Sequence, residues 1–261
     1  MSYKNIVFEH LEDGIATIIV CRPDKLNAMD RDTMAELETA FEYVQNEATV
    51  RGLIVTGEGP KAFVAGADIR ELADIDALTA AQLSTRGQNT FRRLELMRKP
   101  SIAAINGFAL GAGLELALSC TLRVAVPEAK LGLPELKLGL IPGYGGTQRL
   151  ARLVGRGKAL ELLLTGDKID AQEAWRIGLV NRITTPDSLL AESRALLATI
   201  LANAPIAVAL AMDAVDIGIS CGQEEGLRFE SAAFGLAAST QDRQEGTRAF
   251  IERRPPVFTG K

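Results

Sequence analysis

Two glutamates within an apolar, glycine-rich stretch constrain this chain more than any other feature. The stretch runs from Ile105 to Arg149 and contains Glu115 and Glu135, each flanked by apolar residues. A buried ionised carboxylate is costly unless it is paired, hydrogen-bonded or kept neutral. Two such residues, each beside a glycine turn, indicate a functional site, and the rest of the chain is then interpreted as its scaffold.

The length and composition predict one large domain, or one domain with an appendage. Of the 261 residues, 47% are hydrophobic, which is enough for a sizeable core. The net charge is −4, the isoelectric point is near 5.3, and the basic residues are scattered. This balance argues against a nucleic-acid or anionic-membrane surface, so we expect neither as a partner.

Cysteine and histidine usage argues against several kinds of site. Cys21, Cys120 and Cys221 are far apart and have no CxxC spacing, so we expect neither a disulfide framework nor a zinc site. The only histidine, His10, lies in a predicted strand and is interpreted as structural, which argues against Ser-His-Asp, Cys-His and histidine-rich metal mechanisms. The cysteine pattern and an N-terminus without a targeting signature predict a cytoplasmic protein.

Short β-branched runs alternate with helical patterns over the first two thirds of the chain, and the last third is mainly helical. This order predicts an α/β fold with a helical C-terminal region. The apolar run 195–212 contains Asn203 and Pro205, so we predict two helices that meet there rather than a membrane span. Strands are expected at 6–8, 15–20, 52–56, 101–105, 122–126 and 179–183, and helices from about 30, at 79–98 and at 111–119.

Two glycine turns offer backbone donors. Ala112 lies in the first helical turn after Gly111, where N–H groups have no partner within the helix. Ala65 lies in an earlier strand-to-helix turn, where Gly66 allows close approach of the backbone. Two such N–H groups directed at one point would form an oxyanion hole. The alternative is that these glycines only allow a strand and a helix to pack tightly.

Each glutamate is placed by a local feature. Glu115 comes three residues after Ala112, so both lie on one helix face. Glu135 follows Pro134, which suits the first position of a short, stiff helix. The alternatives are a solvated helix glutamate at 115 and a helix-capping carboxylate at 135. The next turn, at 143–148, either accepts an anion or only brings a loop close to the site.

Competing motifs fail. Leu116 occupies the place of the third glycine of a dinucleotide-binding GxGxxG motif. No Walker lysine and serine follow Gly146, and the sequence contains no GxSxG elbow. Two carboxylates with an oxyanion hole, without a nucleophile, metal or histidine, favour proton transfer beside a carbonyl with stabilisation of an enolate. We therefore expect no metal site.

Five blocks of sequence carry a family resemblance. KAFVAGADI at 61–69, INGFALGAGLELAL at 105–118 and LPELKLGLIPGYGGTQRL at 133–150 look like the signature blocks of the crotonase, or enoyl-CoA hydratase, superfamily. RPDKLNAM at 22–29 and TGDKIDAQEAWRIGLVNRI at 165–183 resemble further blocks. The likeness covers almost the whole chain in the right order.

The resemblance implies a crotonase-like spiral of ββα units over residues 1–200 and a helical trimerisation region over 201–261. It implies a homo-oligomer, either a trimer or a dimer of trimers, and an acyl-CoA substrate whose thioester carbonyl lies between the N–H groups of Ala65 and Ala112. Coenzyme A enters as part of the substrate, and no separate cofactor is expected. The implied CoA-binding residues are Arg22, Lys25, Ala65, Gly66, Ala67, Asp68, Ile69, Gly111 and, from a neighbouring subunit, Phe258 and Lys261.

The glutamate pair resembles the hydratase branch of the superfamily. This implies syn addition of water to a trans-2-enoyl-CoA to give a (3S)-3-hydroxyacyl-CoA, with Glu115 and Glu135 as the acid–base groups. The chain departs from many relatives at Ala112, where they carry glycine, so we expect an ordinary helical backbone there. The alternatives are an enoyl-CoA isomerase, another CoA-thioester lyase of this fold, or a non-catalytic RNA-associated or scaffold member. Acyl-chain length and pathway stay open.

Overall fold

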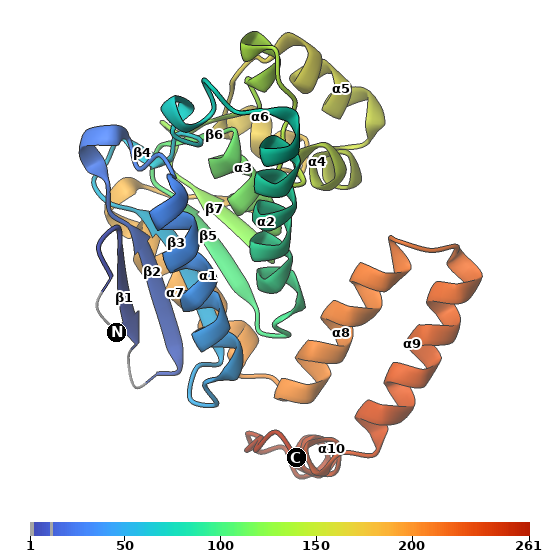
Figure 1. Cartoon of the computed structure of the whole chain (residues 1–261). Helices are drawn as coiled ribbons and strands as arrows, with labels where there is room; N and C mark the ends of the chain where they lie inside the picture. Colours follow the sequence, from blue (N-terminus) through green and yellow to red (C-terminus); the bar gives the residue numbers. More distant parts are fainter. Residues whose placement is uncertain (1–2, 11–12) are drawn as a thin grey trace. The chain divides into compact units, whose positions relative to one another are not determined.

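The computed structural model describes residues 3–10 and 13–261, and the strands of these residues form two sheets (Figure 1). One has six strands in the order β1-β2-β3-β5-β7-β10, where β1 and β2 are antiparallel and the following pairs are parallel. The other has the order β4-β6-β8-β9. The strands are β1 Ile6–His10, β2 Ile15–Val20, β3 Gly52–Gly57, β4 Ala62–Val64, β5 Ser101–Ile105, β6 Phe108–Leu110, β7 Leu122–Ala125, β8 Lys130–Gly132, β9 Ile169–Asp170 and β10 Arg182–Ile183.

A repeated ββα unit generates both sheets. Strands β3, β5 and β7 are neighbours in the first sheet, and the strands that follow them, β4, β6 and β8, are neighbours in the second. These neighbours are all parallel, so equivalent turns of successive units lie next to one another. The predicted α/β spiral is therefore confirmed, and it brings together turns that are far apart in the sequence.

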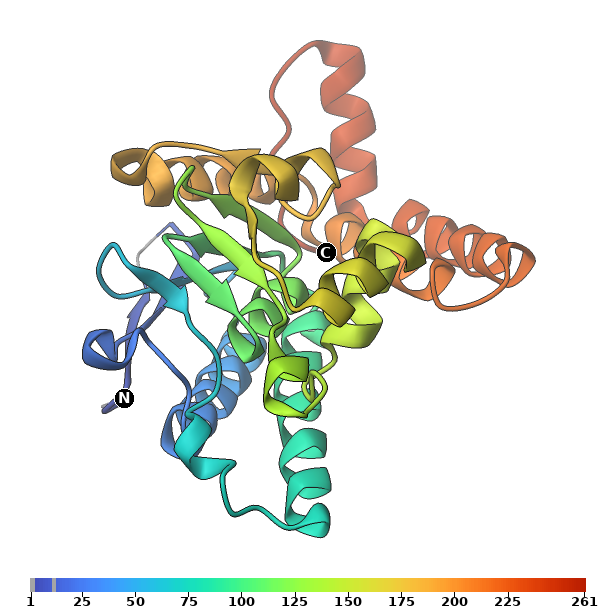
Figure 2. The ribbon, with the colours of Figure 1, turned by 90° about the horizontal axis from the view of Figure 1, so that it is seen from above.

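Helices α1 (Arg31–Asn46) and α2 (Ala77–Leu96) lie on one face of the six-stranded sheet (Figures 1 and 2). Each begins after an aspartate, Asp30 or Asp76, whose carboxylate accepts from an N–H in the first turn. Helix α3 (Ala112–Ser119) is buried along its whole length, as expected of a helix that is apolar all round. The other helices before residue 189 are η1 Pro23–Lys25, η2 Ile69–Glu71, η3 Glu135–Leu138, α4 Gly146–Val154, α5 Arg156–Thr165, α6 Ala171–Arg176 and η4 Pro186–Ser188.

The strand predicted at 179–183 is shorter than expected. Only Arg182 and Ile183 pair with β7. The N–H groups of Leu179 and Val180 instead donate to the Ala174 carbonyl, which closes the end of α6. Leu179 and Val180 therefore complete the end of helix α6 and do not extend the strand.

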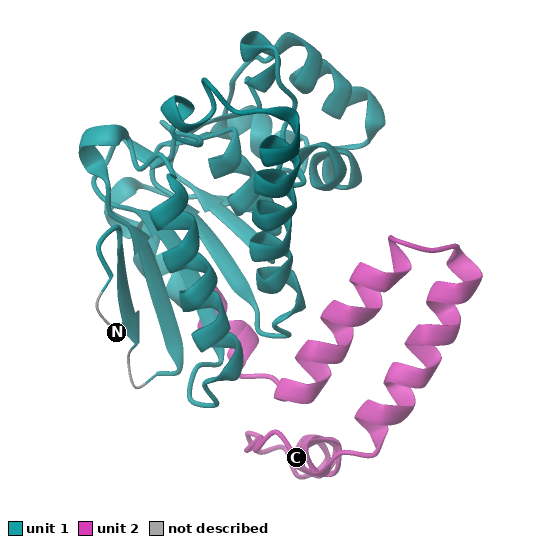
Figure 3. Ribbon diagram, in the orientation of Figure 1, with its two compact units in different colours: residues 1–194 teal, residues 195–261 magenta. Residues whose placement is uncertain are grey.

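The chain divides into two compact units, residues 1–194 and 195–261 (Figure 3). Helix α7 (Leu189–Leu201) ends and α8 (Pro205–Gly218) begins on either side of Asn203, as predicted. Within unit 2, α8 packs against α9 (Gln223–Ala238), and α10 (Gln241–Glu252) follows. Among the described residues, no single helix is long and apolar enough to cross a membrane; the segment 186–201 and α8 meet that test only together, as a bent pair.

Candidate active site

Glu115 lies in the first turn of α3 and is buried, with 1% of its surface exposed. Its Oε1 accepts hydrogen bonds from the backbone N–H groups of Tyr144 and Gly146, both at 2.8 Å. Gly146 is packed so closely that an added Cβ would lie 3.0 Å from Oε1. Glu115 is therefore not a solvated helix residue, and the turn at 143–148 binds an anion that the chain itself supplies.

Burial raises the pKa of Glu115 to about 7. Loss of water around the carboxylate is the largest cause, and the charge of Glu135 adds to it. The hydrogen bonds from Gly146 and Tyr144 act in the opposite direction because they stabilise the ionised form. A carboxyl group with a pKa near neutrality is suited to accept and return a proton.

Glu135, which is half-buried, supplies the second carboxyl group of the site. It begins η3 directly after Pro134, as predicted, and burial raises its pKa. A Cβ added at Gly111 would lie 2.8 Å from Glu135 Oε1, so the carboxyl group lies over the turn that precedes α3. Among the described residues, Oε2 is buried without a hydrogen-bond partner. Such an oxygen is costly to the fold, and this is the arrangement expected of a group whose partner is a substrate.

Two strand-to-helix turns meet beside these carboxyl groups. Because β4 and β6 are parallel neighbours, the turns that follow them are adjacent. Gly66 and Gly111 have φ values of 114° and 52°, which favour glycine, and a Cβ added at Gly111 would lie 3.7 Å from the Gly66 Cα. Ala112 is the first residue of α3, so its N–H has no acceptor within the helix.

The structure corrects the predicted upstream donor. The Ala65 N–H donates to the Leu26 carbonyl at 3.1 Å and is therefore not available to a substrate. Leu26 belongs to the segment after η1, and its position relative to β4 is a long-range feature of the fold. Spacing within the 61–69 block could not reveal this bond.

The available donor of this turn is the N–H of Ala67. Ala67 forms an isolated parallel bridge with Met29, in which the Met29 N–H donates to Gly66 O at 2.9 Å and the Asp68 N–H donates to Met29 O at 2.8 Å. In a parallel ladder, the residue between two bonded positions directs its own N–H to the other side. The N–H groups of Ala67 and Ala112 are thus the candidate oxyanion pair.

The comparisons with known proteins identify the family of this chain. The model of the family described as enoyl-CoA hydratase/isomerase matches residues 10–261. The chain belongs to this family. It is 45% identical over 261 residues to a crotonyl-CoA hydratase of Syntrophomonas wolfei, with 100% of both chains covered. It is 44% identical to a short-chain-enoyl-CoA hydratase of Clostridium acetobutylicum, with 97% of both covered.

Solved structures of the family share the fold. A crystal structure of an enoyl-CoA hydratase from Bacillus anthracis has a TM-score of 0.94 and 39% identity, and the match covers 99% of this chain and 100% of that one. An enoyl-CoA hydratase subunit from Geobacillus kaustophilus has a TM-score of 0.94 and 40% identity, with 99% of both chains covered. The predicted crotonase-like fold and family are therefore confirmed.

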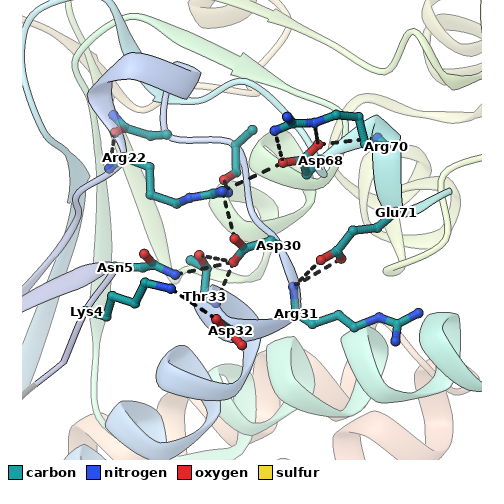
Figure 4. A network of polar contacts seen from close by, with 12 residues as sticks. Lys4, Asn5, Arg22, Asp30, Arg31, Asp32, Thr33, Asp68, Arg70 and Glu71 are labelled. Carbon is teal, nitrogen blue, oxygen red and sulfur yellow. Dashed lines mark hydrogen bonds and ion pairs between the residues drawn. The ribbon is translucent and has the colours of Figure 1, made fainter.

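Arg22, one of the residues that the family resemblance places at CoA, lies in an ionic network (Figure 4). Its guanidinium pairs with Asp30 at 2.7 Å and with Asp68 at 3.7 Å, and it also donates to the Ala28 carbonyl. Two carboxylates thus already compensate its charge. Lys25, in η1, is exposed, so it is the cation of the two that faces solvent. A role for either residue at the CoA phosphates stays a prediction.

The segment 65–69 has mixed roles. The Arg70 guanidinium donates to both oxygens of Asp68, at 3.0 and 2.9 Å, and these bonds lower the pKa of Asp68 to about 2. Asp68 therefore ties η2 to the Arg22 network. Ile69, by contrast, is 57% exposed and available for a ligand contact. The predicted contact of this segment with the adenine end of CoA stays a prediction.

The C-terminal tail is hydrogen-bonded to α10 within unit 2. Asp242, which is buried, accepts from the Thr259 and Gly260 N–H groups at 2.7 and 2.8 Å, and its own N–H donates to Lys261 O. The Phe258 ring lies against α10, where a Cβ added at Gly246 would be 3.2 Å away. The contact of Phe258 and Lys261 with CoA bound to a neighbouring subunit stays a prediction.

Proposed function

We propose that this protein is an enoyl-CoA hydratase that adds water to a trans-2-enoyl-CoA and forms a (3S)-3-hydroxyacyl-CoA. The observation that carries the proposal is the presence of the buried Glu115 carboxyl group and the half-buried Glu135 carboxyl group beside the turns that present the Ala67 and Ala112 N–H groups. The hydratases at 44–45% identity over nearly the full chain support the same reaction. The substrate is an acyl-CoA thioester.

Each part of the site has a role in the addition. The Glu115 carboxylate takes a proton from water while the water oxygen bonds to Cβ. The electron pair of the double bond moves toward the thioester carbonyl, where the N–H groups of Ala67 and Ala112 stabilise the enolate oxygen. Glu135 holds the water and delivers a proton to Cα. The proton on Glu115 returns to Glu135 before the next turnover, so both carboxyl groups are restored.

The direct test is incubation with crotonyl-CoA while the absorbance of the conjugated enoyl thioester is followed. We expect the absorbance to fall as the double bond is hydrated, and chiral analysis to identify the (3S) product. Acyl chains from four to sixteen carbons are compared in the same assay. If no chain length loses its enoyl absorbance, the proposal is wrong.

A second candidate is an enoyl-CoA isomerase, because the family description covers both reactions. An isomerase moves the double bond without water, so only one proton is relayed and no hydroxyl group appears. Incubation with a 3-enoyl-CoA separates the two reactions. Accumulation of 2-enoyl-CoA without any 3-hydroxyacyl-CoA would favour the isomerase.

Glu135→Gln is expected to lower kcat about a hundredfold or more and to leave KM within about threefold. The amide keeps the shape of the side chain but cannot deliver the proton to Cα. The matched control is Glu128→Gln, which makes the same substitution at an exposed position. An equal loss in both variants, or a change confined to KM, would contradict the assigned role.

For assembly, we propose a trimer or a dimer of trimers formed through unit 2. Large apolar side chains of α9 and α10 support association because they are 55–86% exposed, and large exposed apolar patches on folded proteins mark interaction surfaces. Sedimentation analysis should give a mass three or six times that of one chain, and a monomer would contradict this. The exposed apolar residues are Leu227, Phe234, Leu236, Phe250 and Ile251.

We further propose that the protein is a cytoplasmic enzyme without a metal, which keeps its activity after dialysis against a chelator.

A further inference from the structure

One face of α2 is turned toward the loop that holds Glu115. Ser84, Gly87, Gln88, Phe91 and Glu95 recur at helical spacings of three and four, so they share a side of the helix. This face meets the loop 143–146 and the start of α4. Gly87 leaves room for the Tyr144 ring, which an added Cβ would overlap, and the Phe91 ring meets the Tyr144 ring edge-on at 5.7 Å.

Side chains of this face contact the peptide that binds Glu115. Ser84 Oγ donates to Gly143 O at 2.6 Å, and Gln88 Nε2 donates to the same oxygen at 2.9 Å. The N–H on the other side of that peptide bond belongs to Tyr144, which donates to Glu115 Oε1 at 2.8 Å. A planar peptide transmits orientation from its carbonyl to its N–H, and hydrogen bonds in a chain polarise one another.

The second donor to Glu115 is supported in a different way. The carbonyl of the peptide that carries the Gly146 N–H is Gly145 O, which accepts from the first turn of α4. Arg149 secures the peptide between them, because it donates to Tyr144 O at 2.7 Å and forms a two-pronged pair with Glu95 at 2.6 and 2.9 Å. The Ser84 hydroxyl and the Gln88 amide of α2 thus bond to the Gly143–Tyr144 peptide. Of the two peptides that donate to Glu115, this is the one whose carbonyl does not accept from α4.

We propose that Ser84 and Gln88 are positioning residues that keep the Gly143–Tyr144 peptide directed at Glu115. They do not touch the reacting atoms and act through the loop. The catalytic consequence rests on the proposed function, in which ionised Glu115 is the base. Because the Tyr144 bond favours the ionised form, loss of the α2 contacts raises the pKa of Glu115 further above its ordinary range.

Other charged groups around Glu115 remain unchanged in the test variants. Glu135 of η3 raises its pKa, Arg149 of α4 lowers it, and the Tyr144 phenol stays neutral because burial and the Glu115 charge raise its pKa to about 12. Arg149 remains paired with Glu95. A shift in the double variant is therefore assigned to the peptide.

The test is the double variant Ser84→Ala, Gln88→Met. We expect the acidic limb of the kcat profile to move up by about half to one pH unit and kcat at pH 7 to fall about two- to fivefold. The single variant Ser84→Thr should have the wild-type profile, because threonine keeps the hydroxyl group and Gln88 is unchanged. The control is Thr85→Ala, Gln82→Met, which makes similar changes at α2 positions that have no hydrogen bond to the loop among the described residues; the Thr85 hydroxyl donates to the Ala81 carbonyl within α2.

A second readout does not depend on activity. Carbon-13 NMR of glutamate-labelled protein, with the Glu115 signal assigned through Glu115→Gln, should show a higher pKa for that carboxyl group in the double variant than in the control. Unchanged titration in a folded double variant would overturn the positioning role, as would a uniform fall in kcat without movement of the acidic limb. Failure of wild-type protein to hydrate any enoyl-CoA would instead overturn the proposed function, and the NMR comparison would still decide the positioning role.

Discussion

Glu115→Gln is expected to lower kcat about a thousandfold and, at the same time, to stabilise the fold at alkaline pH. The amide can still accept the bonds from Tyr144 and Gly146 at its oxygen, but it cannot take a proton from water. Loss of a general base typically costs 10²–10⁴ in rate. Wild-type activity is expected to fall below neutral pH for the same reason, because the protonated Glu115 carboxyl group is no longer a base.

The stability gain follows from the direction of the pKa shift. Folding raises the pKa of Glu115 from 4.5 to about 7, so the folded protein holds this proton more tightly than the unfolded chain. The contribution of Glu115 to stability is fully present below pH 4.5 and is lost as the pH rises through 7. Glutamine stays neutral, so at pH 8 the variant should exceed the wild type by up to about 3 kcal/mol.

Urea unfolding at pH 5 and pH 8, together with the hydration assay, measures both effects. The difference in unfolding free energy between variant and wild type should grow from pH 5 to pH 8. Glu128→Gln, at an exposed position, should show neither effect. A variant that retains a tenth of wild-type kcat, or that is less stable than the wild type at pH 8, would refute the assigned environment.

Gly113→Ala is expected to destabilise the protein by about 3 kcal/mol or more, enough to reduce soluble expression sharply. Gly113 lies within α3, where alanine would ordinarily favour the helix. An added Cβ would, however, overlap the carbonyl group of Val64 at the end of β4. Because the obstacle is backbone in the second sheet, relief requires α3 to move away from β4, and with it Ala112 and Glu115.

Gly157→Ala is the matched control for this substitution. Gly157 also lies in a helix, α5, but an added Cβ there would meet no atom within 4 Å. The control should be neutral or stabilising by up to about 1 kcal/mol, because alanine is the better helix former. Equal stability of the two variants in urea would show that α3 and β4 are not in close contact.

Local features of the stretch from Ile105 to Arg149 could be predicted because neighbours in sequence decide them. The spacing of Ala112 and Glu115 places both in the first turn of α3, and Pro134 starts η3 at Glu135, as predicted. The apolar neighbours of Glu115 indicated burial, and the structure buries it. The alternation of strands and helices, with the block resemblance, gave the α/β spiral.

The wrong prediction of Ala65 as the upstream donor has a different cause from these local successes. Ala65 and Ala67 stand two residues apart in one turn, and only the bond from Ala65 to Leu26 and the bridge between Ala67 and Met29 distinguish them. For this donor, the identity of a hydrogen-bond partner far along the chain decides the outcome. The strand predicted at 179–183 is short for a local reason instead, because the Leu179 N–H donates to Ala174 at the end of α6.

The sequence alone therefore singled out the two candidate acid–base residues, since Glu115 and Glu135 must be explained wherever they fold. The tertiary structure decided the hydrogen bonds of these residues and the pKa of their carboxyl groups. Tyr144 and Gly146 reach Glu115 from about 30 residues away, and Ser84 reaches Gly143 across 59. A carboxyl pKa is set by lost water and by donors that long-range packing supplies, and backbone N–H groups become available only where that packing leaves them without an acceptor.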